Sequence, residues 1–114
     1  MFKIRTLMLA LALALTPLPL AGPARAADGF SRCPNGHLCL FSEFDGNGTI
    51  AWFQSGAPNL EPLGVKDARS AWNRTGRSFC LFASPNYEVH NATVPPGHKE
   101  GLNPEIAYNS VRAC

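Results

Sequence analysis

The chain has 114 residues, and the first 26 have the character of a removable leader, which leaves 88 residues for one small domain. That length excludes a doubly wound nucleotide-binding fold and a (β/α)8 barrel. Residues 27–114 carry seven basic and eight acidic side chains, a balance of −1. Charge therefore gives no support to nucleic acid or an anionic membrane as a partner.

The first 26 residues have the three parts of a secretory signal peptide. Lys3 and Arg5 form a positive start, residues 7–15 are an unbroken apolar run, and residues 24–26 form a small-x-small cleavage site. The alternative is a membrane anchor, but Pro17 and two later prolines interrupt the stretch well short of the roughly 20 residues that a spanning helix needs. We expect cleavage after residue 26, a secreted domain over residues 27–114, and no membrane attachment after cleavage.

The exported part is interrupted throughout by turn-forming residues. Gly, Pro and Asn make up 24 of its 88 residues, and the longest stretch without Gly or Pro is residues 65–75. This pattern excludes a bundle of ordinary helices and favours short strands between turns, with at most one helical turn over residues 61–68. The expected strands are residues 38–42, 49–53, 70–74, 78–82, 89–94 and 108–112.

An internal repeat relates the two halves of the exported part. Cys39-Leu40-Phe41 recurs as Cys80-Leu81-Phe82 with an offset of 41, and residues 70–72 correspond to residues 110–112 with an offset of 40. Two copies of about 40 residues with four strands each predict an all-β sandwich of two Greek-key motifs that bury their apolar faces against each other. The expected core and inter-sheet aromatic residues are Phe41, Trp52, Phe53, Trp72, Phe79, Phe82, Tyr87 and Tyr108.

All four cysteines, Cys33, Cys39, Cys80 and Cys114, lie in the exported part. An even count in a small secreted chain predicts two disulfides, for which three pairings are possible. Cys33 and Cys39 are close in sequence and separated by turn residues, so their loop closes easily and leaves Cys80 for Cys114. A zinc site is the alternative, but the spacing contains no C-x2-C pair and His37 has no partner at finger spacing.

No motif indicates an enzyme. The three histidines, His37, His90 and His98, do not stand at metal-ligand spacings, and the chain has no Gly-x-Ser-x-Gly elbow or phosphate loop. The acidic residues are scattered singly, whereas glycoside hydrolysis needs two facing carboxylates. We therefore expect no catalytic residues and no cofactor beyond weakly bound calcium.

An ordered set of short motifs covers essentially all of residues 27–114. They are Cys33-Pro34-Asn35-Gly36, Leu38-Cys39-Leu40-Phe41, Asn59-Leu60, Asp67, Ser70, Trp72-Asn73-Arg74-Thr75-Gly76, Cys80-Leu81-Phe82, Asn86-Tyr87, Pro96-Gly97 and Ser110-Val111-Arg112-Ala113-Cys114. With these motifs the chain resembles the secreted actinobacterial peptidase-inhibitor family typified by the Streptomyces metalloproteinase inhibitor. The resemblance implies a single βγ-crystallin-like domain, in agreement with the repeat.

The resemblance also implies a hairpin pattern in which an aromatic residue is followed seven positions later by Gly, because the folded hairpin needs a positive φ there. Phe41 and Gly48 fit this pattern. In the second copy Phe82 leads to Val89, and a β-branched residue tolerates positive φ poorly. Either the second hairpin has a different shape or its register is shifted.

Many crystallin-like domains bind calcium through paired motifs of the form Asx-Asx-x-x-Ser/Thr-Ser, which supply oxygen ligands. In the first motif only Asp67 and Ser70 fit, and Lys66 places a cation where an acid is expected. In the second motif Ile106 and Asn109 replace expected ligands. Asp67 and Ser70 are therefore the metal candidates, for a weak site, and the alternative is that they only hydrogen-bond a loop.

The resemblance implies a peptidase inhibitor that docks a rigid loop in an extracellular protease, either a metalloprotease or a serine protease. The candidate loops are residues 34–38, 45–48 and 84–90. The family's established inhibitory loop is a second small cysteine-closed loop, which this sequence lacks because Cys80 has no cysteine nearby, so the inhibitory residues stay unassigned. The alternative is a non-inhibitory extracellular binding module for calcium, a cell-wall polymer or a protein. We expect a monomer.

Overall fold

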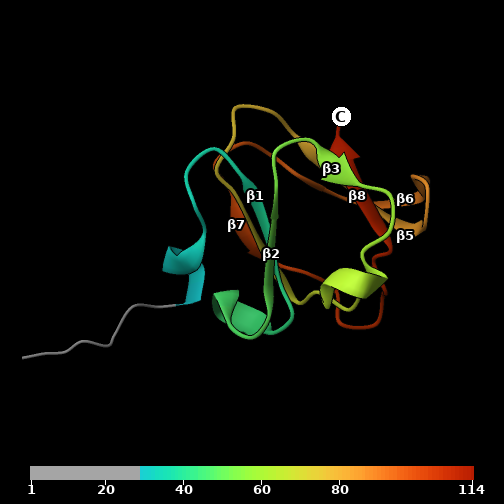
Figure 1. Ribbon diagram of the computed structural model, residues 1–114, viewed down its shortest axis with the longest axis horizontal. Helices are drawn as coiled ribbons and strands as arrows, with labels where there is room; N and C mark the ends of the chain where they lie inside the picture. The colour runs from blue at the N-terminus through green and yellow to red at the C-terminus, as the bar shows by residue number, and fades with distance from the viewer. Residues whose placement is uncertain (1–28) are drawn as a thin grey trace, which may run out of the picture.

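The computed structural model describes residues 29–114, which fold into two four-stranded antiparallel sheets (Figure 1). The leader predicted for residues 1–26 lies outside the described residues. The first sheet has the order β2 (Ile50–Phe53), β1 (Leu38–Phe41), β4 (Ser70–Asn73) and β7 (Lys99–Gly101). The second has the order β3 (Gly56–Ala57), β8 (Ser110–Ala113), β5 (Phe79–Ser84) and β6 (Glu88–Val94).

The two halves of the chain exchange one strand each. β3 comes from the first half but pairs with β8 in the second sheet, and β7 comes from the second half but pairs with β4 in the first sheet. The segments that follow these two strands are held in equivalent ways, since Leu60 N donates to Asn109 O and Leu102 N donates to Arg69 O, both at 2.8 Å. The predicted sandwich of two Greek-key motifs is therefore confirmed, and neither sheet is complete without the other half of the chain.

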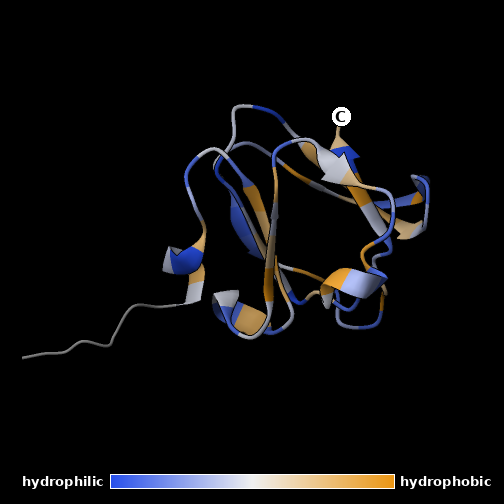
Figure 2. Cartoon of the chain, viewed as in Figure 1, coloured by the Kyte–Doolittle hydropathy of each residue, from blue (hydrophilic) through white to orange (hydrophobic). Residues whose placement is uncertain are grey.

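The core lies between the inner faces of the two sheets. Because side chains alternate along a strand, Leu38 and Leu40 point inward from β1, while the intervening Cys39 and the following Phe41 lie on the outer face. Figure 2 shows β1 as mainly hydrophobic and the edge strand β7 as hydrophilic, and a charged edge discourages further strand pairing. The buried core residues are Leu38, Leu40, Phe53, Leu60, Val65, Ala68, Ala71, Phe79, Leu81, Val94, Leu102, Tyr108 and Val111.

Two disulfides fasten the ends of the described chain to the outer faces of the sheets. Cys33 is bonded to Cys39 of β1, and Cys80 of β5 is bonded to Cys114. The predicted pairing is confirmed. The first disulfide packs with Phe41 in a small second cluster, which Phe30, Ile50 and Trp72 help to cover.

Three short 3-10 segments complete the fold of residues 29–114: η2 (Gly29–Arg32), η3 (Phe44–Gly46), which contains the left-handed Asp45, and η4 (Glu61–Leu63). The turn expected over residues 61–68 is thus shorter than predicted. It ends at Gly64, whose φ of 79° is left-handed. Among the described residues, no helix has the length and apolar character needed to cross a membrane.

The aromatic residues are only partly where the sequence predicted them. Phe53, Phe79 and Tyr108 belong to the core. Trp52 does not, because it pairs with Cys39 across β1 and β2, shares its outward face, and is 52% exposed. Phe41 and Phe82 are buried, but outside the core between the sheets.

Candidate functional site

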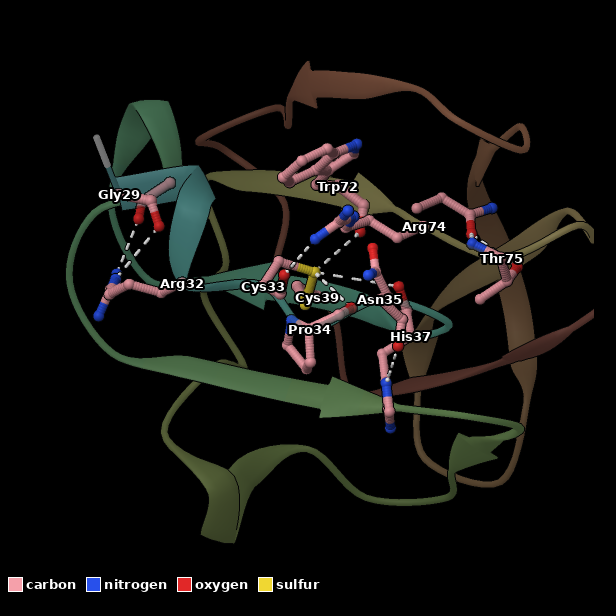
Figure 3. The surroundings of a disulfide bond; sticks show 12 residues. Gly29, Arg32, Cys33, Pro34, Asn35, His37, Cys39, Trp72, Arg74 and Thr75 are labelled. Carbon is pink, nitrogen blue, oxygen red and sulfur yellow. Dashed lines mark hydrogen bonds between the residues drawn. A yellow bond between two sulfur atoms is a disulfide. The ribbon is translucent and has the colours of Figure 1, made fainter. Parts of the chain in front are cut away.

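Of the three candidate loops, residues 34–38 lie beside Arg74, which follows the end of β4 (Figure 3). Gly36 N donates to Arg74 O at 3.0 Å, and Arg74 N donates to His37 O at 2.9 Å. The Arg74 guanidinium also donates to Cys33 O at 2.7 Å, and lies 4.4 Å from the centre of the Trp72 ring. This loop is therefore held to the sheet by backbone hydrogen bonds, and its exposed residues are Asn35 and Gly36.

The β1–β2 hairpin, which contains the second candidate loop, is covered on one side by η2. Arg32 Nη2 donates to Gly46 O at 2.7 Å. A Cβ on Gly46 would lie 2.4 Å from Phe30 N, and a Cβ on Gly29 would lie 1.9 Å from Gly46 O. The two segments pack so closely that glycine is required at both positions, and this hairpin is partly enclosed by the chain itself.

The β5–β6 hairpin, which contains the third candidate loop, repeats the backbone of the first with an offset of 41. Three residues in each hairpin have a left-handed φ, which residues other than Gly, Asn and Asp rarely adopt. The corresponding pairs are Asp45 (58°) and Asn86 (62°), Gly46 (73°) and Tyr87 (67°), and Gly48 (79°) and Val89 (63°). The second hairpin therefore keeps the folded shape without the glycines.

The sequence left two possibilities for this hairpin, a different shape or a shifted register, and the structure decides between them. The loop shape is retained, and β6 has an irregularity opposite Leu81 and Phe82, so that Phe82 pairs with His90 while Leu81 pairs with Ala92. Asn91 is the extra residue. A bulge of this kind sharpens the local twist and redirects the strand end.

Packing explains the left-handed backbone at Tyr87. Its ring meets Phe82 edge-on with centroids 5.9 Å apart, as the ring of Phe30 meets Phe41 at 5.3 Å in the other half. Arg112 lies 4.6 Å from the centre of the Tyr87 ring, a distance typical of a cation–π contact. Tyr87 thus supplies from within the hairpin the cover that η2 gives to the first hairpin.

Packing does not explain Val89, which is 62% exposed. At the equivalent Gly48, a Cβ would lie 2.2 Å from Ser42 Oγ and 2.6 Å from Glu43 Cγ. The residue equivalent to Ser42 is Ala83, which has no hydroxyl. The second hairpin therefore has room for a side chain at this position, and it presents that side chain to solvent.

Three residues from outside the hairpin hold it in place by hydrogen bonds. Ser110 Oγ accepts a hydrogen bond from Tyr87 N at 3.0 Å and donates to Ser84 O at 2.6 Å. Asn86 N donates to Pro58 O at 3.0 Å, and the Asn109 side-chain amide donates to Ala83 O. In Figure 1 the hairpin forms one extremity of the domain. It combines a fixed backbone with an exposed apolar side chain.

Asp67 and Ser70, the metal candidates, occupy different surroundings. Asp67 is exposed at a hollow of about 440 Å³ that also contains Glu43, Glu61, Lys66 and Arg69. Ser70 is buried, and its hydroxyl accepts from Gly46 N and donates to Glu43 O. No group of three or more His, Cys, Asp or Glu side chains in residues 29–114 is arranged to hold a metal ion. Calcium binding through Asp67 stays a prediction.

Comparison with known proteins gives a family and a fold. Residues 26–94 match the sequence profile of peptidase inhibitor family I36. A βγ-crystallin domain solved in work on the evolution of the eye-lens fold is 12% identical, with a TM-score of 0.61 over 70% of this chain and 86% of that one. A βγ-crystallin from Ciona intestinalis is 18% identical, with a TM-score of 0.58 over 69% of this chain and 100% of the other. No curated protein matches the chain.

The sequence marks Val89 as an irregular position but does not connect it with Ala83 or Tyr87. The signal was present in the offset of 41, which aligns residues 42–48 with residues 83–89 one by one. This alignment does not show that the backbone stays left-handed at Val89, because a hairpin of different shape would avoid the strain at a β-branched residue.

Proposed function

Because the chain belongs to peptidase inhibitor family I36, we propose that it is a secreted inhibitor of an extracellular protease, either a metalloprotease or a serine protease. We propose further that it acts by docking the β5–β6 hairpin, residues 84–90, at the active-site cleft. The family supports inhibition as the activity and gives no reason to expect catalysis by this chain.

One difference carries the choice of hairpin: both hairpins have a fixed backbone and an exposed apolar side chain, Phe44 at 49% and Val89 at 62%, but η2 covers only the first. Ser110 bonds to both sides of the loop, and Asn86 is tied to Pro58. An inhibitor loop that is already ordered loses little conformational entropy on binding, which improves affinity. The first hairpin is less suitable because η2 covers it, and residues 34–38 are hydrogen-bonded just beyond the end of β4.

Export is supported by the chemistry of the chain. The two disulfides are typical of proteins that fold in an oxidising compartment, and the first 26 residues have the pattern of a signal peptide. Mass spectrometry of the protein recovered from the medium of its producing cells would give the cleavage position, which we expect after residue 26.

The proposal is tested with oxidised residues 27–114 and a panel of a thermolysin-like metalloprotease, a subtilisin and a trypsin, at one fixed calcium concentration. We expect tight inhibition of one class, titrating at one inhibitor molecule per enzyme. A matched variant carries residues 43–49 in place of residues 84–90, which keeps a hairpin of the same length. Absence of inhibition across the panel at micromolar excess, with the protein intact afterwards, would contradict the proposal.

A further inference from the structure

We infer that Val89 is the residue by which this hairpin selects its protease, and that the protease holds the hairpin without cutting it. The inference rests on the proposed function. The Val89 side chain determines the specificity of the contact, and the left-handed backbone around it makes the hairpin resistant to cleavage.

Val89 is the most exposed large apolar residue of residues 29–114, at 62%, and it stands at a position whose backbone favours glycine. The ring of Tyr87, two residues earlier, has a packing role, but folding gains little from Val89. A strained residue that the core does not require is a marker of a binding site.

A β-branched side chain has few rotamers, so it loses little entropy when it is buried in a partner. Glu88 and His90 on either side are exposed, and His90 Nε2 lies 2.9 Å from Thr93 Oγ1. An apolar centre with a polar surround is the usual composition of a contact site. The complementary surface on the protease is therefore a pocket that accepts a small aliphatic side chain.

A chain that adds to a sheet edge does so in extended form, with side chains alternating between its two faces. With φ values of 62°, 67° and 63° at Asn86, Tyr87 and Val89, this hairpin cannot run along a cleft in that form. Extending it would break the bonds from Ser110 to Tyr87 and Ser84. The protease therefore binds the hairpin in its folded form. No peptide bond of residues 84–90 is then extended in the cleft for attack.

The test compares inhibition constants of the wild type, Val89→Thr and Val89→Gly against the protease that the panel identifies. Thr keeps the branched shape and the backbone, so it removes only apolar character, whereas Gly removes the side chain. We expect weaker inhibition by roughly tenfold for Thr and thirtyfold for Gly, as for a central contact residue. Phe44→Ala, which truncates the 49% exposed Phe44 of the other hairpin, is the control and should leave inhibition within about twofold.

Mass spectrometry of the wild type after prolonged incubation with the enzyme tests the second part. We expect the intact mass, and a cut within residues 84–90 would overturn the claim that the hairpin resists cleavage. Unchanged inhibition by both Val89 variants would overturn the assignment of Val89 while leaving the inhibitor proposal in place. A wild type that inhibits no protease would instead remove the proposed function itself.

Discussion

Ser70 and Ser110 make the same pair of hydrogen bonds in the two halves of the domain. Ser70 Oγ accepts from Gly46 N and donates to Glu43 O, at 2.9 and 2.7 Å. Ser110 Oγ accepts from Tyr87 N and donates to Ser84 O, at 3.0 and 2.6 Å. Each serine begins the last strand of its Greek key and fixes the hairpin made by the first two strands. One hydroxyl thus links the sheet to the loop in each half.

Ser110→Ala and Ser70→Ala should have similar effects on stability and different effects on function. Both serines are buried, at 0% and 1% exposure, and removal of either leaves a loop amide without its acceptor, so each variant should lose about 1–3 kcal/mol. Only Ser110→Ala frees the proposed docking hairpin, so it alone should weaken protease inhibition. Thermal melts and inhibition constants measured on both variants check this, and equal loss of inhibition would argue against the β5–β6 hairpin.

Val89→Gly should leave the free energy of unfolding unchanged or raise it by up to about 1 kcal/mol. Relief of the left-handed strain, about 1–2 kcal/mol, offsets the added freedom of glycine in the unfolded chain and the small loss of burial. Val94→Gly is the matched control, because Val94 is 0% exposed in the core, and it should lose about 3 kcal/mol or more. Denaturant titrations would measure both. A loss above about 1 kcal/mol at Val89 would mean that its side chain supports the fold.

The two disulfides should contribute unequally. Their cysteines are 34 residues apart for Cys80 and Cys114 but 6 apart for Cys33 and Cys39. The chain-entropy account assigns nearly 4 and roughly 2 kcal/mol to loops of these lengths. Replacing each pair by alanine and comparing melting temperatures should show the larger loss for Cys80 with Cys114. Equal losses would count against the entropic explanation.

Gly29→Ala should detach η2 from the first hairpin. A Cβ at this position would lie 1.9 Å from Gly46 O, and overpacking of this kind typically destabilises by about 1–3 kcal/mol. Hydrogen exchange in residues 29–32 should rise, and the contacts of Phe30 with Phe41 and Trp72 should be lost. Gly76→Ala is the control, since no atom lies within 4 Å of a Cβ there. A stable Gly29→Ala protein would show that the two segments can separate without consequence.

The sequence pattern predicts six of the eight strands of residues 29–114 within one or two residues at each end, because those segments are rich in aromatic and β-branched residues and are bounded by turn signals. It does not place β3 and β7, where Gly56–Ala57 and Lys99–Gly101 have no apolar pattern. These two segments are strands because the neighbouring sheet offers them hydrogen-bonding partners. The exchange of strands between the halves is therefore a tertiary effect that local sequence does not contain.

Aromatic composition alone did not predict which rings are buried. Trp52 and Phe53 are neighbours on β2, so one must face outward, and pairing with Leu38 directs Phe53 into the core. For the candidate site, the repeat correctly aligned Val89 with Gly48. The left-handed backbone at Val89 was not predictable, because it depends on Ser110 and Pro58, which approach the hairpin only in the folded domain.

The most direct test of the central claim is amide hydrogen exchange of residues 84–90 in the free inhibitor and in its complex with the protease that it inhibits. Residues 43–49, the equivalent hairpin, provide an internal reference in the same sample. Docking of the β5–β6 hairpin predicts slower exchange in residues 84–90 on binding and no change in residues 43–49. Unchanged exchange in residues 84–90, together with protection of residues 43–49 or 33–39, would contradict the account.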